Sequence, residues 1–237
     1  MMRSKLFLFV ILSMVIITSC EKSIYTERER SLFITPIFDH DVNLDSINTL
    51  FDIVVYFDQI YCEDNSAEKW PVLYFDLEKK EIVNPQQGKN ILAIGIEPSP
   101  CSDMIYEYDF SRILEVVKDG YNLEVEQERI EIDTLYNFVT LQYLNYGKDF
   151  RFSADPLNNG IWLIADKNDK LDDLNIYIAQ LIEGFVQMAQ QYAQIEYGKR
   201  IDQLTELEFT KLKNDLVFHL SFKYTEEEEE SQIKMGY

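Results

Sequence analysis

The chain has 237 residues, of which 46% are hydrophobic and 14% aromatic, and its formal net charge is −20 at pH 7. This supply of apolar side chains is enough to build a core, so the composition is that of a globular protein and not of a disordered chain. Nucleic-acid binding depends on Lys and Arg neutralising phosphates, so the strong negative charge excludes it as a function.

The first 19 residues have the layout of a secretory signal. Arg3 and Lys5 form a basic start, and an apolar run from Leu6 to Ile17 follows. The run is well under the about 20 residues that a membrane-spanning helix needs, and no later stretch reaches that length without charges. The pattern therefore predicts a signal peptide over residues 1–19 and a mature chain that does not span a membrane.

The residues at the end of this run, Ile17, Thr18, Ser19 and Cys20, resemble the lipobox of bacterial lipoproteins. The resemblance implies that the Cys20 thiol becomes a diacylglycerol thioether, that the peptide is cut before it, and that the new amine is acylated. Two or three acyl chains, at about 0.8 kcal/mol per buried methylene, hold a domain on a membrane essentially permanently. The alternative is an ordinary cleaved signal whose exit happens to contain a cysteine.

The residue after the lipid cysteine indicates which membrane the protein reaches. In such lipoproteins an Asp at this position commonly causes retention at the inner membrane, but here the residue is Glu21. The resemblance therefore implies the outer membrane. The charges that follow alternate in sign and do not form the dense acidic run that marks surface export in some lineages, so we expect the periplasmic face, with the cell surface as the alternative.

The mature chain divides into three parts by composition. Residues 20–31 are charged without periodicity and are expected to form an acylated tether, residues 32–224 form a globular domain, and residues 225–237 form an acidic disordered tail. Without the signal the net charge becomes −22, because Arg3 and Lys5 are lost. Such a charge suits a soluble body held away from its membrane, or one that meets a basic partner.

Two cysteines remain after Cys20, namely Cys62 and Cys101. In an oxidising compartment such an even pair predicts a disulfide. Closing a loop of about 40 residues would stabilise the fold by about 3 to 4 kcal/mol in the chain-entropy model. The alternative is two separate buried thiols.

The next part of the chain alternates strand and helix patterns. Strands are expected at 32–38, through Val54 and Val55, at 72–75, at 91–96 and at 161–164, with a hairpin over 123–132. Helices are expected over 110–117, between Asp109 and Gly120, and over 134–146, after Asp133 as its cap. These patterns predict an α+β fold with a mixed or antiparallel sheet and inserted helices.

The C-terminal third has helical periodicity, and we expect a helical hairpin over about 171–224. A strict heptad seam consists of Leu174, Ile178, Leu181, Phe185, Met188, Tyr192 and Ile195, with Gly198 ending the helix. A second amphipathic stretch runs from Leu204 to Leu220, which would place His219 on a helix. The seam either packs on its own hairpin and sheet or forms a coiled coil with another chain, as a candidate interaction site.

The sequence offers few groups for catalysis or cofactor binding. His40 and His219 are the only histidines, no phosphate-binding glycine loop occurs, and no paired-cysteine metal motif is present. No cofactor, no metal and no enzymatic activity are therefore expected.

The alternating residues Asp39, Asp41, Asn43 and Asp45 resemble the first half of an EF-hand calcium loop. Leu44 and Leu50 stand where that loop requires Gly and a bidentate Glu, so an acidic helix-capping loop is favoured over a calcium site. The acidic residues between 166 and 172 similarly indicate a turn and cap before the long helix.

These observations favour a non-enzymatic, lipid-anchored interaction or scaffold protein. Its membrane contact would be the anchor on Cys20, and its partner would be a protein of the cell envelope, in an assembly such as a secretion system. The alternative is a lipid-anchored binding module for a small ligand, a glycan or an incoming toxin, of the immunity type. In that case exposed aromatic residues such as Trp70 and Trp162 would be the contacts.

Overall fold

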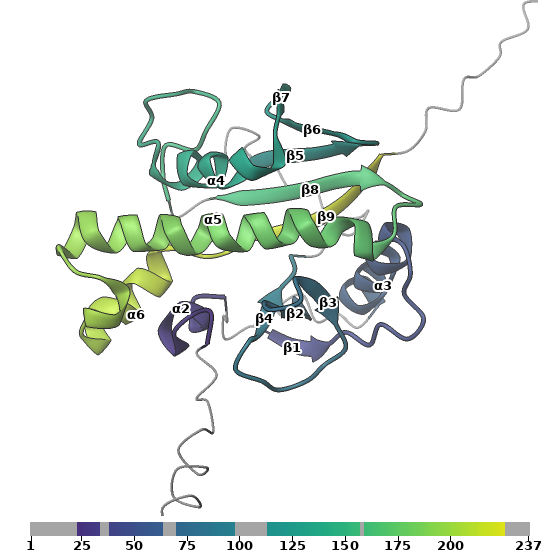
Figure 1. The fold of residues 1–237 in the computed structure, drawn as a ribbon, viewed down its shortest axis with the longest axis horizontal. Coiled ribbons are helices and arrows are strands. Elements are labelled where there is room, and N and C mark those ends of the chain that lie inside the picture. The colour runs from purple at the N-terminus through teal and green to yellow at the C-terminus, as the bar shows by residue number, and fades with distance from the viewer. Residues whose placement is uncertain (1–22, 34–37, 64–69, 98–112, 157–158, 226–237) are drawn as a thin grey trace, which may run out of the picture.

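The computed structural model describes residues 23–33, 38–63, 70–97, 113–156 and 159–225. The structure contains helices and two sheets, with helices inserted between groups of strands, which is the predicted α+β class (Figure 1). The elements are α2 (Glu27–Ser31), β1 (Phe38–Asp41), α3 (Leu50–Glu63), β2 (Trp70–Asp76), β3 (Glu81–Val83), β4 (Ile91–Gly95), β5 (Ile113–Asp119), β6 (Asn122–Val125), β7 (Glu128–Ile130), η2 (Ile132–Thr134), α4 (Leu135–Leu144), β8 (Gly160–Asp166), α5 (Leu171–Tyr197), η3 (Ile201–Gln203), α6 (Glu206–Asp215) and β9 (Leu220–Thr225).

The strands form two sheets. In the four-stranded sheet, β2 pairs with β4 along one edge and with β1 and then β3 along the other. The five-stranded sheet has the order β7-β6-β5-β8-β9, in which β5, β8 and β9 are parallel and β6 and β7 extend the sheet as antiparallel strands. The two sheets meet at a bridge between Ile96 and Leu220.

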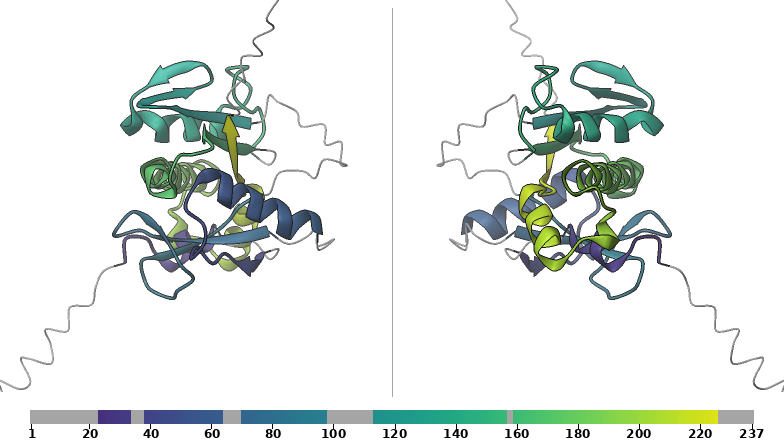
Figure 2. Two further views of the ribbon diagram at one scale, coloured as in Figure 1. Left: turned by 90° about the vertical axis from the view of Figure 1, so that its right-hand side faces the viewer. Right: turned by 90° about the vertical axis from the view of Figure 1, so that its left-hand side faces the viewer.

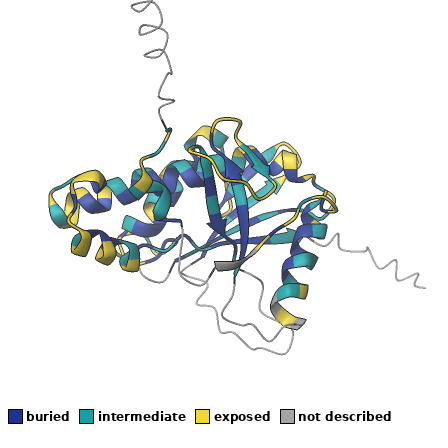
Figure 3. Ribbon diagram, turned by 90° about the horizontal axis from the view of Figure 1, so that it is seen from below, coloured by how far each residue is buried: buried dark blue, intermediate teal, exposed yellow. Residues whose placement is uncertain are grey.

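The long helix α5 lies between two parts of the molecule. On one side are β5, β6, β7 and α4, and on the other are α2 and the four-stranded sheet (Figures 1 and 2). Side chains from both sheets and from α5 join one hydrophobic core. Figure 3 shows that the central strands are mostly buried, whereas exposed residues lie on loops and on the outer sides of helices.

A glycine allows α4 and α5 to approach closely. A Cβ atom added to Gly184 would lie 2.9 Å from the Cα of Tyr136 and 3.0 Å from the Cβ of Val139. Any larger residue at this position would push the helices apart or distort the backbone. The α4–α5 contact therefore depends on this single glycine.

Many of the predicted elements are present. The expected strands at 72–75, 91–96 and 161–164 are parts of β2, β4 and β8, and the predicted hairpin is β6 and β7. The predicted helix over 134–146 is α4, but its N-cap is Thr134, which makes no side-chain cap bond, and not the predicted Asp133, which lies in η2. The heptad helix is α5, and it ends as predicted at Gly198, which has a left-handed φ of 64°.

The predicted strand through Val54 and Val55 is wrong, because these residues lie in helix α3. The helix begins where Asp52 accepts hydrogen bonds from the backbone N–H groups of Asn48 and Thr49, and where Thr49 Oγ1 accepts one from Asp52 N. These bonds satisfy the free N–H groups of the first turn. The sequence of α3 does not reveal its helical period, because apolar residues follow one another directly from Ile53 to Phe57.

One further helix prediction is wrong, and another extends too far. Residues 113–117, expected to be helical, belong to β5, which pairs in parallel with β8; residues 109–112 lie outside the described residues. The predicted second helix of the C-terminal hairpin is shorter than expected, because α6 ends at Asp215 and the chain then forms β9. In both places, pairing with β8 decides the structure, and sequence periodicity does not reveal such distant pairing.

The segment of residues 23–33, whose first part was expected to be a loose tether, is packed on the body. Helix α2 starts with a capping box in which Thr26 and Glu29 satisfy each other's backbone N–H groups. Arg28 donates hydrogen bonds to the carbonyls of Ile201 and Leu204 and pairs with Glu206. The prediction of an aperiodic tether is therefore wrong from Ser23 onward.

Candidate functional site

Four of the nine large apolar side chains that are exposed among the described residues belong to residues 113–156, here called the 113–156 lobe. It includes β5, β6, β7, η2 and α4. Phe150 is 89% exposed and Tyr121, at the turn between β5 and β6, is fully exposed, while Leu141 and Tyr146 are more than 40% exposed. Aromatic residues are enriched at the hot spots of interfaces, so Phe150, Tyr121 and Tyr146 are candidate contacts.

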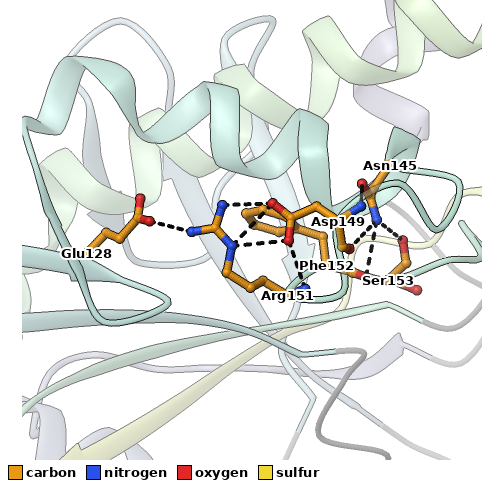
Figure 4. A network of polar contacts seen from close by, with 6 residues as sticks. All are labelled: Glu128, Asn145, Asp149, Arg151, Phe152 and Ser153. Atoms are coloured by element: carbon orange, nitrogen blue, oxygen red, sulfur yellow. Dashed lines mark hydrogen bonds and ion pairs between the residues drawn. The ribbon is translucent and has the colours of Figure 1, made fainter.

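Phe150 stands on a loop, residues 145–153, that is held from inside by Asn145. The Asn145 side chain is only 3% exposed, and its Nδ2 donates to the carbonyl of Asp149 at 2.6 Å and to the carbonyls of Phe152 and Ser153 at 3.4 Å (Figure 4). Its Oδ1 accepts a hydrogen bond from Asp149 N at 2.8 Å. One buried amide thus fixes both ends of the loop.

An arginine braces the same loop from outside. Arg151 Nη2 contacts Asp149 Oδ2 at 2.7 Å, Arg151 Nε donates to both Asp149 oxygens, and Nη1 pairs with Glu128 of β7 (Figure 4). The guanidinium carbon of Arg151 also lies 5.4 Å from the centre of the Phe152 ring. The bidentate geometry makes this ion pair stiffer than an ordinary surface pair.

Electrostatic interactions favour the ionised forms of both Asp149 and Arg151. Hydrogen bonds from the Arg151 side chain and backbone hold the pKa of Asp149 below its usual value. In turn, the hydrogen bonds that Arg151 makes with Asp149 and Glu128 raise the pKa of Arg151. Both partners therefore remain ionised at neutral pH, so the loop keeps its clamp under ordinary conditions.

The loop backbone is thus preorganised and holds the exposed aromatic ring of Phe150 in a fixed position. Because Asn145 and Arg151 already fix the backbone, little conformational entropy remains to be lost when Phe150 enters a complementary pocket. The carboxylates, the guanidinium and the amide of this network all serve to fix the loop, an arrangement that suits binding.

The predicted heptad seam is mostly inside the chain's own core. Its members from Leu174 to Met188 are almost fully buried and Tyr192 is 7% exposed, whereas Ile195 is 61% exposed. Phe185 packs against Phe33, Tyr143 and Phe218. The seam therefore packs on its own chain, and the alternative of a coiled coil with another chain is wrong for the buried members.

The acidic stretch that resembled a calcium loop is used in local contacts. Asp41 accepts a hydrogen bond from the Tyr74 hydroxyl at 2.7 Å, and Asp45 accepts one from the side chain of Asn84 at 3.1 Å. Asn43 accepts from the backbone of Asp45. The side chains of Asp39 and His40 lie outside the description, and the described part of the chain contains no group of three or more His, Cys, Asp or Glu residues that could hold a metal ion.

The cysteine predictions remain predictions. Cys20 and Cys101 lie outside the described residues, and Cys62 lies near the end of α3. Among the described helices, none combines the length and apolar character of a membrane span.

The aromatic residues of the alternative ligand site are already engaged within the chain. The ring of Trp70 lies 5.0 Å from that of His219, and His219 Nδ1 lies 3.5 Å from a carboxylate oxygen of Glu97. Lys223 lies over the ring of Trp162 at 5.1 Å. His219 precedes β9 and is not on a helix, so that part of the sequence interpretation is wrong.

The sequence interpretation missed Asn145, Asp149, Phe150 and Arg151. The only signal was Gly147, which marked the end of a helix and hence a loop. Searches of family models, curated proteins and solved structures found no match to this chain. The candidate site therefore rests on its own geometry.

Proposed function

We propose that the protein is a lipid-anchored interaction protein of the bacterial cell envelope, held on the periplasmic face of the outer membrane through Cys20. Its 113–156 lobe docks a protein partner, as an accessory component of an envelope-spanning assembly such as a secretion system. The observation that carries this proposal is the rigid loop that presents Phe150 to solvent.

The position of the N-terminal segment supports an orientation for this docking. Ser23 Oγ donates to the carbonyl of Lys89 at 2.9 Å, so the described chain starts fixed on the side of the four-stranded sheet. Only two residues separate Ser23 from Cys20, and an extended chain spans at most about 3.6 Å per residue. The lipid would therefore keep this side against the membrane, with the 113–156 lobe on the far side of α5 (Figure 1).

The chemistry of the partner follows from the site. Phe150 requires an apolar pocket, and a mature chain with net charge −22 favours a partner whose rim is positively charged. Steering of this kind raises the association rate, while the buried ring provides most of the binding free energy.

The test is copurification in mild detergent with Phe150→Ala in the lipidated protein. We expect the wild type to bring down a stoichiometric envelope partner and Phe150→Ala to lose at least tenfold of it, because an exposed ring adds little to folding but much to a hot spot. The matched control is Leu207→Ala on α6, which is 82% exposed but lies on the anchor side. A wild type that always elutes alone and monomeric would overturn the proposal.

The same preparation tests the anchor. Cys20→Ala should abolish incorporation of labelled palmitate and release the protein from membranes, while leaving the purified body folded. Unchanged labelling would end the lipoprotein hypothesis without touching the docking site.

A further inference from the structure

A cavity of about 340 Å³ lies between the N-terminal segment, the four-stranded sheet and α5. Its walls are mainly apolar and include Phe75, Leu77, Ile182 and Val186, which are otherwise buried in the core. Its volume is at the lower end of the about 300 to 1,000 Å³ that ligand sites in proteins occupy. The cavity is therefore large enough for a slender apolar group.

The N-terminal segment itself forms one wall. Ile24 and Tyr25 line the cavity, although Ile24 is still 50% exposed. Hydrogen bonds from Ser23 to the carbonyls of Tyr25 and Lys89, and from Ile24 N to the side chain of Asn90, hold this wall in place. This wall is therefore a fixed part of the folded domain.

The chain places one particular apolar group beside this cavity. Cys20 precedes Ile24 by four residues, so even a fully extended chain separates their two Cα atoms by at most about 14 Å. A thioether-linked acyl chain at Cys20 therefore starts within reach of the opening.

We propose that this cavity holds one acyl chain of the lipidated Cys20. The inference rests on the proposed lipidation, and it adds a second role for the anchor: one chain seats the body while the others enter the bilayer. Phe75, Ile182 and Val186 would contact the methylenes. Lys80, at the rim, would place its ammonium beside the ester oxygens of the glyceryl group.

A consequence of this arrangement is a fixed orientation. A body joined to its membrane only by a flexible peptide rotates freely, whereas a body that also grips its own lipid presents one side to the bilayer. The 113–156 lobe, on the other side of α5, would then always face the partner.

The experiment uses cells fed an alkyne fatty acid that carries a photoreactive diazirine. After irradiation, the purified lipidated protein is digested and analysed by mass spectrometry. We expect the label on Cys20 and intramolecular crosslinks from its alkyl chain to peptides of α5 that contain Ile182 or Val186. A labelled Cys20 whose crosslinks go only to bilayer lipids would overturn the cavity proposal, whereas an unlabelled Cys20 would overturn the anchor instead.

Two variants sharpen the result. Ala179→Trp fills the cavity and should reduce the α5 crosslink at least fivefold without reducing the label on Cys20. Ile176→Trp, one turn earlier on α5 and 52% exposed outside this cavity, should leave the crosslink unchanged. Because the wild-type crosslink is itself decisive, the test holds even if Ala179→Trp fails to fold.

Discussion

An arginine holds each of two regions of the molecule in place, but the apolar residues beside it are buried in one region and exposed in the other. In the N-terminal segment, Arg28 binds two carbonyls at the start of the α6 region and Glu206, and the residues that follow, Leu32 and Phe33, are buried. In the 145–153 loop, Arg151 binds Asp149 and Glu128, yet the adjacent Phe150 remains exposed. The first arrangement attaches a terminus to the core, and the second stiffens a loop for presentation.

The largest expected effect comes from removing the buried hub of the presenting loop. Asn145→Ala leaves Asp149 N and several buried carbonyls without their partner, so the free energy of unfolding should fall by about 2 kcal/mol. Urea unfolding followed by circular dichroism measures this loss. Asn137→Ala, on the exposed side of α4, is the control and should change stability by less than about 0.5 kcal/mol.

Asn145→Ala also tests whether the 145–153 loop is stabilised independently of residues 23–33. Hydrogen exchange should increase in residues 145–153 and remain unchanged in residues 23–33, because none of the hydrogen bonds and ion pairs of Asn145 reaches residues 23–33. Equal exchange in wild type and Asn145→Ala would show that the loop is not held by this side chain.

A smaller effect is expected when the attaching arginine is removed. Arg28→Ala loses two hydrogen bonds to carbonyls and a partly exposed ion pair, so the free energy of unfolding should fall by about 1 kcal/mol. The main consequence is local: residues 23–33 should become sensitive to limited proteolysis. Arg129→Ala, an exposed arginine of β7, is the matched control, and if it opened the N-terminal segment equally the attachment role would be refuted.

The two regions also differ in how far the sequence predicts them. Helix α5 was predictable because a long heptad pattern ends at a glycine that takes a left-handed conformation. The docking of α2 was not, because Arg28 binds carbonyls more than 170 residues away. An apolar residue such as Phe150 is expected in the core by default, so its exposure becomes evident only when the fold shows which side of the loop faces solvent.

The smallest effect is a difference in acid sensitivity between two carboxylates. Hydrogen bonds from Lys199, and then from Thr205, lower the pKa of Glu208 from 4.5 to about 2, and those from Arg151 lower the pKa of Asp149. Since both pKa values are lowered by folding, each carboxylate contributes stability that is complete above its unfolded pKa and is lost as the pH falls through its folded pKa. The free energy of unfolding should therefore decline between about pH 4.5 and pH 2.

Glu208→Gln and Asp149→Asn test which region carries this decline. Each should lower stability at pH 7 and make the curve between pH 4.5 and pH 2 shallower than that of the wild type, since the removed group no longer binds a proton there. Urea midpoints measured at intervals of half a pH unit provide the comparison. Because Asp149 lies in the presenting loop, Asp149→Asn should also expose residues 145–153 to hydrogen exchange at pH 7, whereas Glu208→Gln should loosen only the start of α6. If both variants kept the wild-type slope, the lowered pKa values would play no part in acid stability.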